Sequence, residues 1–98
     1  MPPILPIELQ VFETGEMWRI DVLSIGKTDY LVMVDKVSHF LMLDTLPNKT
    51  LKAMSSKLKR WAAIMGIPCI MCSDRGPAFS ANHFTAFCRD LGVRHVLT

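Results

Sequence analysis

The sequence lacks most of the features that mark membrane-spanning, secreted or disulfide-rich proteins. Its longest apolar stretch is the twelve residues 61–72, which Gly66 and Pro68 interrupt, so no transmembrane helix is predicted. The first ten residues contain no basic residue and no long apolar run, which argues against a secretory signal. Three cysteines do not make a disulfide framework and favour a reducing compartment. We expect one small globular domain from 98 residues, half of them apolar.

Acidic residues are unevenly distributed, and glutamate is absent after Glu16. Residues 1–44 hold seven acids and three bases, a net charge of −4, whereas residues 45–73 hold five bases and no acid. The total charge of +2 is too small to indicate a partner by its magnitude. The asymmetry instead predicts an acidic region followed by one basic element.

Three short segments after residue 16 have the patterns of strands. Residues 18–23 alternate between two faces, residues 30–34 are apolar on both faces, and residues 40–45 follow a short polar connection. Short loops join all three, so the simplest arrangement is an antiparallel meander. Three prolines interrupt residues 1–16, which we interpret as a leader before a domain at residues 17–98.

Helix and strand patterns alternate in the second half of the chain. Asn48 or Thr50 caps a first helix, residues 69–72 form a short strand, Ser80 caps a second helix, and residues 93–97 form a last strand. The apolar stripes of the two helices consist of Leu51, Met54, Leu58, Trp61, Ala62 and Met65, and of Phe84, Phe87, Cys88 and Leu91. The order βββαβαβ predicts an α/β fold, a mixed sheet with helices packed on it.

Two aspartates occupy positions that suit a metal ion. Asp21 lies inside a predicted strand, where an unpaired carboxylate is costly, and Asp74 follows the strand after the first helix. If these two strands are parallel neighbours, they lie about 4.8 Å apart and both carboxylates reach one divalent ion. Mg²⁺ prefers oxygen ligands and often takes only one or two protein carboxylates together with phosphate groups. Such a pair suits phosphoryl transfer on nucleic acid.

A series of short motifs in fixed order makes this interpretation more specific. Together they resemble the catalytic core of integrases of retroviruses and gypsy-type long-terminal-repeat retrotransposons, over residues 18–98. The most specific motif is S-D-R-G-P-x-F. In order, the motifs are W-R-I-D at 18–21, Y-L-V-M-V-D-K-V-S-H-F at 30–40, G-I-P at 66–68, S-D-R-G-P-A-F-S at 73–80 and F-C-R-D-L-G-V at 87–93.

The resemblance implies an RNase H-like fold and an Asp-Asp-Glu site that binds Mg²⁺ or Mn²⁺. Asp21 matches the first Asp, which bridges both metals in the family, and Asp74 matches the second. The family cleaves phosphodiesters and transfers strands without a covalent protein intermediate. The family's Glu lies on a later helix, but only 24 residues follow Asp74 and none is Glu. We therefore expect the fold to be incomplete at the C-terminus, metal binding to be weak, and strand transfer by this chain to be slight or absent.

The resemblance also implies DNA as the partner. Arg75 adjoins Asp74 in a glycine-containing loop, where a phosphate would lie, and Lys52 and Lys59 belong to the basic helix face. A solvated helix face is the commoner meaning of such a basic run. We expect no membrane and no small-molecule substrate, leave homo-oligomerisation open, and expect an intracellular protein that is nuclear when it acts on DNA.

Other polar residues have ordinary structural interpretations. Asp35 matches a non-catalytic position in the family, and Asp90 is expected to face solvent. Cys69 and Cys72 are three apart in a predicted strand and therefore point to opposite faces, which favours packing over zinc or redox chemistry. The three histidines are scattered.

The sequence also allows two alternatives to a catalytic-core fragment. One is a non-catalytic nucleic-acid-binding or protein-interaction module derived from a retroelement integrase. The other is an unrelated α/β domain that binds no metal. Metal titration separates these two alternatives from the catalytic-core fragment. Only the catalytic-core fragment predicts Mg²⁺ or Mn²⁺ binding that is lost in Asp21→Asn.

Overall fold

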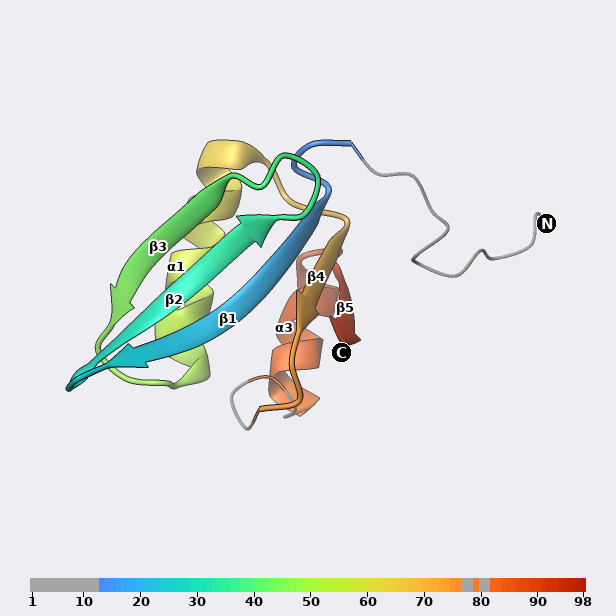
Figure 1. The fold of residues 1–98 in the computed structure, drawn as a ribbon. Coiled ribbons are helices and arrows are strands. Elements are labelled where there is room, and N and C mark those ends of the chain that lie inside the picture. Colours follow the sequence, from blue (N-terminus) through green and yellow to red (C-terminus); the bar gives the residue numbers. More distant parts are fainter. Residues whose placement is uncertain (1–12, 77–78, 80–81) are drawn as a thin grey trace.

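The computed structural model describes residues 13–76, 79 and 82–98. Strands and helices follow one another in the predicted order (Figure 1). Their bounds are β1 (Met17–Ile25), β2 (Thr28–Asp35), β3 (Leu41–Leu46), α1 (Leu51–Met65), β4 (Ile70–Ser73), α3 (Asn82–Asp90) and β5 (Arg94–Leu97). The predicted cap Ser80, and most of the predicted leader, lie outside the described residues.

The five strands form one sheet in the order β3-β2-β1-β4-β5. β1 pairs antiparallel with β2, and β2 pairs antiparallel with β3, which confirms the predicted meander. On its other side β1 pairs parallel with β4, and β4 pairs parallel with β5. The sheet is therefore mixed, and β1 is the strand at which the antiparallel part meets the parallel part.

The first hairpin extends further than the alternation pattern predicts. Its ladder continues to the pair Ile25 and Thr28, and Gly26 has a positive φ of 62° in the two-residue turn. Glycine adopts this left-handed conformation without steric cost, and such turns match the twist of the flanking strands. β3 begins at Leu41, one residue later than predicted, because the carbonyl of Phe40 closes the preceding loop.

Local capping sets both ends of α1. Thr50 is the N-cap, and its side-chain oxygen accepts a hydrogen bond of 3.3 Å from the backbone N–H of Ala53. At the other end Gly66 has a φ of 91°, and its N–H donates to the carbonyl of Ala62 over 2.8 Å. In the part of the chain that the structure describes, no helix combines the length and the apolar character needed to cross a membrane.

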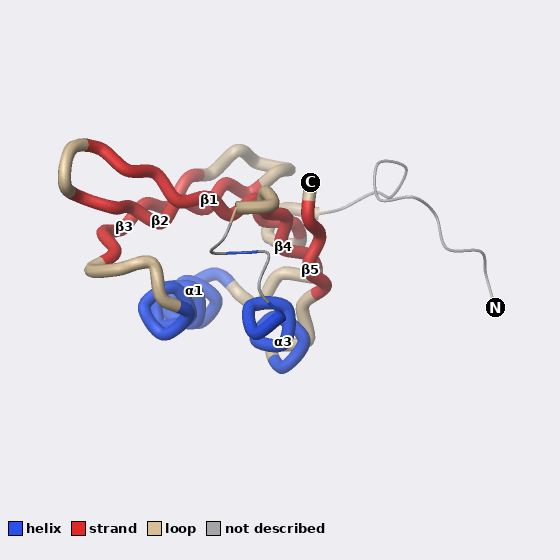
Figure 2. The backbone as a smooth tube through the Cα atoms, turned by 90° about the horizontal axis from the view of Figure 1, so that it is seen from below, coloured by secondary structure: helices blue, strands red, loops and turns tan. Residues whose placement is uncertain are grey.

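Both helices cover the same face of the sheet (Figure 2). The core lies between the sheet and the helices, and its fully buried side chains come from all parts of the domain. They include Trp18, Ile20, Leu31, Met33, Met54, Leu58, Met71, Phe84 and Cys88. The predicted stripes are thus confirmed, although Leu51, Met65, Phe87 and Leu91 are only partly buried. Among residues 13–76, 79 and 82–98, no helix covers the opposite face, where Leu41 and Leu43 are about half exposed.

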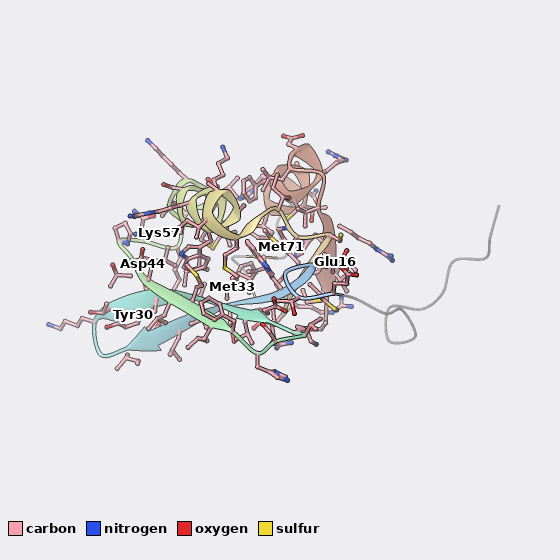
Figure 3. The ribbon with its side chains drawn as sticks, turned by 90° about the horizontal axis from the view of Figure 1, so that it is seen from above. Glu16, Tyr30, Met33, Asp44, Lys57 and Met71 are labelled. Carbon is pink, nitrogen blue, oxygen red and sulfur yellow. The ribbon has the colours of Figure 1, made fainter. Side chains whose placement is uncertain are left out.

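An ion pair ties α1 to the edge of the meander. Lys57 donates to a carboxylate oxygen of Asp44 on β3 over 2.9 Å, and Figure 3 shows the two side chains together between strand and helix. This hydrogen bond lowers the pKa of Asp44 below its ordinary value. Lys49 lies 4.0 Å from Asp29 in the same region. Part of the basic stretch therefore neutralises acids of the meander.

Candidate metal centre and nucleic-acid interface

The parallel pairing of β1 with β4 brings Asp21 and Asp74 to the same level of the sheet. The last pair in this ladder is Arg19 with Cys72. Asp21 lies two residues beyond Arg19, and Asp74 lies two residues beyond Cys72. Both aspartates are exposed. The shared metal site predicted from the sequence required these two strands to be parallel neighbours, and they are.

Each of the two carboxylates has one local hydrogen bond. An oxygen of Asp21 accepts from the N–H of Val22 over 2.9 Å, and an oxygen of Asp74 accepts from the N–H of Gly76 over 2.8 Å. In the described residues no hydrogen bond reaches the second oxygen, Oδ2, of either group. Each aspartate is thus an exposed residue with one carboxylate oxygen that accepts no hydrogen bond within the described part of the chain.

Glycine at position 76 leaves room for the carboxylate of Asp74. A Cβ placed on Gly76 would lie 2.9 Å from the Oδ1 of Asp74, which is closer than carbon and oxygen normally approach. A side chain at position 76 would therefore crowd the carboxylate in this turn.

These donors fit a divalent cation in kind but not as a full set. Carboxylate oxygens are the ligands that Mg²⁺ and Mn²⁺ prefer. In the described part of the chain no three His, Cys, Asp or Glu side chains are placed to hold one metal ion. The residues present would hold a metal through two carboxylates, and the remaining ligands would be water or phosphate oxygens.

The predicted DNA-contacting residues fall into two places. Arg75 is exposed and directly follows Asp74. Lys52 and Lys59 are exposed on α1, and the ammonium of Lys59 lies 5.9 Å from the ring centre of Phe87 on α3. Among the described residues no hydrogen bond or ion pair joins either lysine to the aspartates. Arg75 is thus adjacent to one of the two aspartates in sequence, whereas both lysines lie on α1.

The cysteines are free thiols. Cys69 is exposed, and its thiol donates to Glu16 over 3.2 Å, which raises the pKa of Cys69. The pKa of Glu16 is lowered, first by the hydrogen bond from the backbone N–H of Glu13 and then by that from the Cys69 thiol. Cys72 and Cys88 are buried, and burial raises the pKa of both, that of Cys88 to about 11. A raised pKa makes a thiol a poor nucleophile and a poor metal ligand at neutral pH.

The two remaining aspartates singled out by the sequence behave as expected. Asp35 is fully buried and accepts hydrogen bonds from the N–H groups of Gly15, Val37 and Ser38 at 2.6 to 3.3 Å. Asp90 is exposed at the end of α3. Asp35 is therefore structural, and among the described residues neither aspartate forms a ligand cluster with Asp21 and Asp74.

One cluster next to Asp74 was missed by sequence reasoning. His95 on β5 has both ring nitrogens close to hydroxyl groups, Nε2 at 2.6 Å from Ser73 and Nδ1 at 3.1 Å from Thr85. Its ring also meets the buried ring of Phe84 edge to face, with centroids 4.9 Å apart. The available signal was the placement of Ser73 and His95 on neighbouring strands, which becomes evident only once β4 and β5 are paired.

Comparison with known proteins places the chain in a family. The integrase core domain model matches residues 13–98, so the chain belongs to the integrase core domain family. Among relatives, it is 33% identical over 86 residues to a Pol-related polyprotein of the mouse intracisternal A-particle MIA14. It is 30% identical over 84 residues to the Gag-Pro-Pol polyprotein of simian retrovirus SRV-1. These matches cover 83% and 82% of the chain, and 10% and 5% of the two polyproteins.

Solved structures show the same architecture. The catalytic core domain of BIV integrase matches 86% of the chain with a TM-score of 0.75 at 21% identity, and the chain covers 55% of that protein. A chain of the simian T-cell lymphotropic virus intasome, solved with the PP2A regulatory subunit B56 gamma, matches 87% of this chain with a TM-score of 0.79 at 25% identity, and 32% of that chain is covered. The fold is thus RNase H-like, as the resemblance implied.

Proposed function

We propose that this chain acts in DNA integration as part of an integrase catalytic core, with Asp21 and Asp74 as two ligands of one divalent metal. Integrase core domains depend in general on divalent metals and bind DNA. The observation that carries the proposal is the register of β1 on β4, which sets two exposed carboxylates level with each other at adjacent strands. DNA as substrate, assembly into an oligomer and a nuclear site of action belong to the same proposal.

The chain's own residues have distinct roles in this proposal. Asp21 and Asp74 hold the metal, and Arg75 binds a phosphate beside it, since a guanidinium matches phosphate oxygens in geometry. When bound, a divalent metal polarises a phosphodiester and activates the attacking hydroxyl or water. No serine or cysteine of the chain needs to act as a nucleophile, which agrees with the raised pKa of the buried thiols.

Titration with Mn²⁺, followed by electron paramagnetic resonance, tests the metal site directly. We expect weak binding by the 98-residue chain, because only two carboxylates contribute. Asp21→Asn and Asp74→Asn should each abolish it, because each removes one of the two charged ligands. Asp90→Asn is the matched control, since it removes an exposed aspartate from another element. Equal binding by wild type and Asp21→Asn would contradict the proposed site.

Strand transfer by this chain is expected to be slight or absent. No glutamate follows Glu16, and the described residues contain no third acid beside Asp21 and Asp74. A labelled donor DNA end, incubated with the chain and Mg²⁺ or Mn²⁺, measures the joining directly. Robust joining would show that two carboxylates suffice.

A second candidate function is binding of nucleic acid without catalysis. The observation that favours it is the absence of a three-ligand cluster among the described residues, together with the exposed Arg75, Lys52 and Lys59. Affinity for a DNA duplex should then fall with salt and should not require metal. Arg75→Ala should lower the salt slope by about one, whereas Lys27→Ala, in the turn between β1 and β2, should leave it unchanged. Binding that vanishes without metal would exclude this candidate.

A further inference from the structure

The cluster around His95 fixes the residue that directly precedes Asp74. Ser73 is the last residue of β4, and its side chain is fully buried. Its hydroxyl shares a hydrogen bond of 2.6 Å with Nε2 of His95. Nδ1 of the same ring lies 3.1 Å from the hydroxyl of Thr85 on α3. The side chain of Ser73 is thus linked through His95 to both the neighbouring strand and a helix.

The main chain of Ser73 is fixed as well. Its carbonyl oxygen accepts hydrogen bonds from the N–H of Thr98 at 2.8 Å and from the hydroxyl of Thr98 at 3.2 Å. The ladder between β4 and β5 also pairs Ser73 with Leu97. Ser73 is therefore fixed through its side chain and its carbonyl group independently.

Asp74 depends on these contacts more than Asp21 does. Asp21 lies within the ladder of β1 and β2, opposite Val32, so strand pairing holds its backbone. Asp74 lies beyond the end of β4, where strand pairing has stopped. The orientation of the Asp74 side chain therefore depends on Ser73, which precedes it, and on the turn that ends at Gly76.

We propose that His95 is a positioning residue for Asp74, acting through the hydrogen bond to the Ser73 hydroxyl. This inference rests on the proposed function, because it gives the orientation of Asp74 a purpose in metal binding. Among the described residues no hydrogen bond joins the ring to Asp74, so the effect of His95 on this carboxylate is indirect. It fixes the backbone at the end of β4 and thereby restricts the orientation of the Asp74 side chain. Thr85 and Phe84 hold the ring in place.

Two isosteric substitutions separate this role from simple packing. The amide end of glutamine reaches the position of Nε2, and that of asparagine reaches the position of Nδ1. His95→Gln therefore keeps the contact to Ser73, whereas His95→Asn keeps only the contact to Thr85. We expect Mn²⁺ affinity close to that of wild type in His95→Gln and about tenfold weaker in His95→Asn, the low end of the effects seen for outer-shell partners of metal ligands.

Further variants make the test independent of stability. Ser73→Ala removes the same hydrogen bond from the other side and should weaken Mn²⁺ binding as much as His95→Asn does, with no additional loss in the double variant. His83→Gln, which alters an exposed histidine on α3, is the control and should bind like wild type. Thermal unfolding of each variant establishes that it is folded at the temperature of the titration.

Each outcome bears on one hypothesis. Wild-type affinity in His95→Asn and Ser73→Ala, or equal losses in His95→Asn and His95→Gln, would overturn the positioning role. If Asp21→Asn and Asp74→Asn bind Mn²⁺ like wild type, the proposed metal site itself fails, and the His95 variants are not needed to show it. Loss in both aspartate variants with intact binding in His95→Asn would leave the metal site standing and remove only the role of His95.

Discussion

Carboxylates are held in opposite ways at the end of β2 and at two other places, the middle of β1 and the position after β4. Asp35 is fully buried, and its two oxygens accept three backbone hydrogen bonds, from Gly15, Val37 and Ser38. Asp21 and Asp74 are exposed, and each accepts one hydrogen bond from a residue close in sequence. The difference indicates different roles. A buried carboxylate whose two oxygens both accept hydrogen bonds stabilises the fold, whereas an exposed carboxylate with one oxygen free of hydrogen bonds in the described residues can bind a ligand.

Electrostatics at Asp35 agree with a structural role. Burial by itself would raise the pKa of this carboxyl group, but the hydrogen bonds from Val37, Gly15 and Ser38 favour the charged form and together outweigh it. The pKa is therefore lowered from its ordinary value of 3.8. Asp35 joins the segment before β1 to the loop after β2, which stabilises the end of the sheet at which β1 begins.

The largest expected effect comes from removing the buried carboxylate. Asp35→Ala leaves three N–H groups without their acceptor in a buried place, and we expect a loss of about 3 kcal/mol in the free energy of unfolding. Urea denaturation followed by tryptophan fluorescence measures it, since Trp18 pairs with Asp35 across the ladder. A loss below about 1 kcal/mol would mean that water replaces the carboxylate easily, and the contrast with Asp74 would disappear.

Acid should remove the same stabilisation. Since the folded-state pKa of Asp35 is lower than its unfolded value, its contribution is present above about pH 4 and is lost as the pH falls through the folded pKa. The unfolding free energy of wild type should therefore decline below pH 3.8, and that of Asp35→Asn should decline less steeply. Asp90→Asn serves as the control. Parallel slopes for wild type and Asp35→Asn would show that other groups, such as Asp44, dominate.

A smaller effect is expected at the turn after Asp74. Gly76→Ala places a Cβ 2.9 Å from the Asp74 carboxylate, whose short side chain must rotate away. We expect Mn²⁺ affinity to fall by about threefold, because metal and catalytic sites tolerate displacements of only about 0.5 Å. The control is Ala63→Gly, at an exposed position of α1, which tests whether a general loss of stability lowers the affinity. A second glycine-to-alanine change, Gly26→Ala, would not be a matched control, because Gly26 has a positive φ.

The smallest expected effect is on stability at the exposed pair. Asp74→Ala should change the unfolding free energy by no more than about 0.5 kcal/mol, because the residue is exposed and loses only one local hydrogen bond. The same urea titration used for Asp35→Ala measures it. A loss comparable to that of Asp35→Ala would assign Asp74 to the fold and weaken its role as a ligand.

Local physics explains why many elements could be predicted before the structure. Thr50 and Gly66 delimit α1 because a side-chain acceptor and a glycine each satisfy nearby backbone groups at a helix end. The stripe of Met54, Leu58 and Trp61 is buried because its spacing follows the helix period. The predicted strand ends were wrong where hydrogen bonding between strands, and not the alternation of apolar residues, sets the end. Examples are the extension of β1 to Ile25 and the start of β3 at Leu41.

The sequence alone determined the order of strands and helices, the buried stripes and the motifs that contain Asp21 and Asp74, because these depend on neighbouring residues and on short periods. The tertiary structure decided which strands are neighbours. The register of β1 on β4 sets the two aspartates level, and the pairing of β4 with β5 brings His95 to Ser73. Contacts between residues 22 or 53 positions apart depend on how the whole chain packs, which no local pattern encodes.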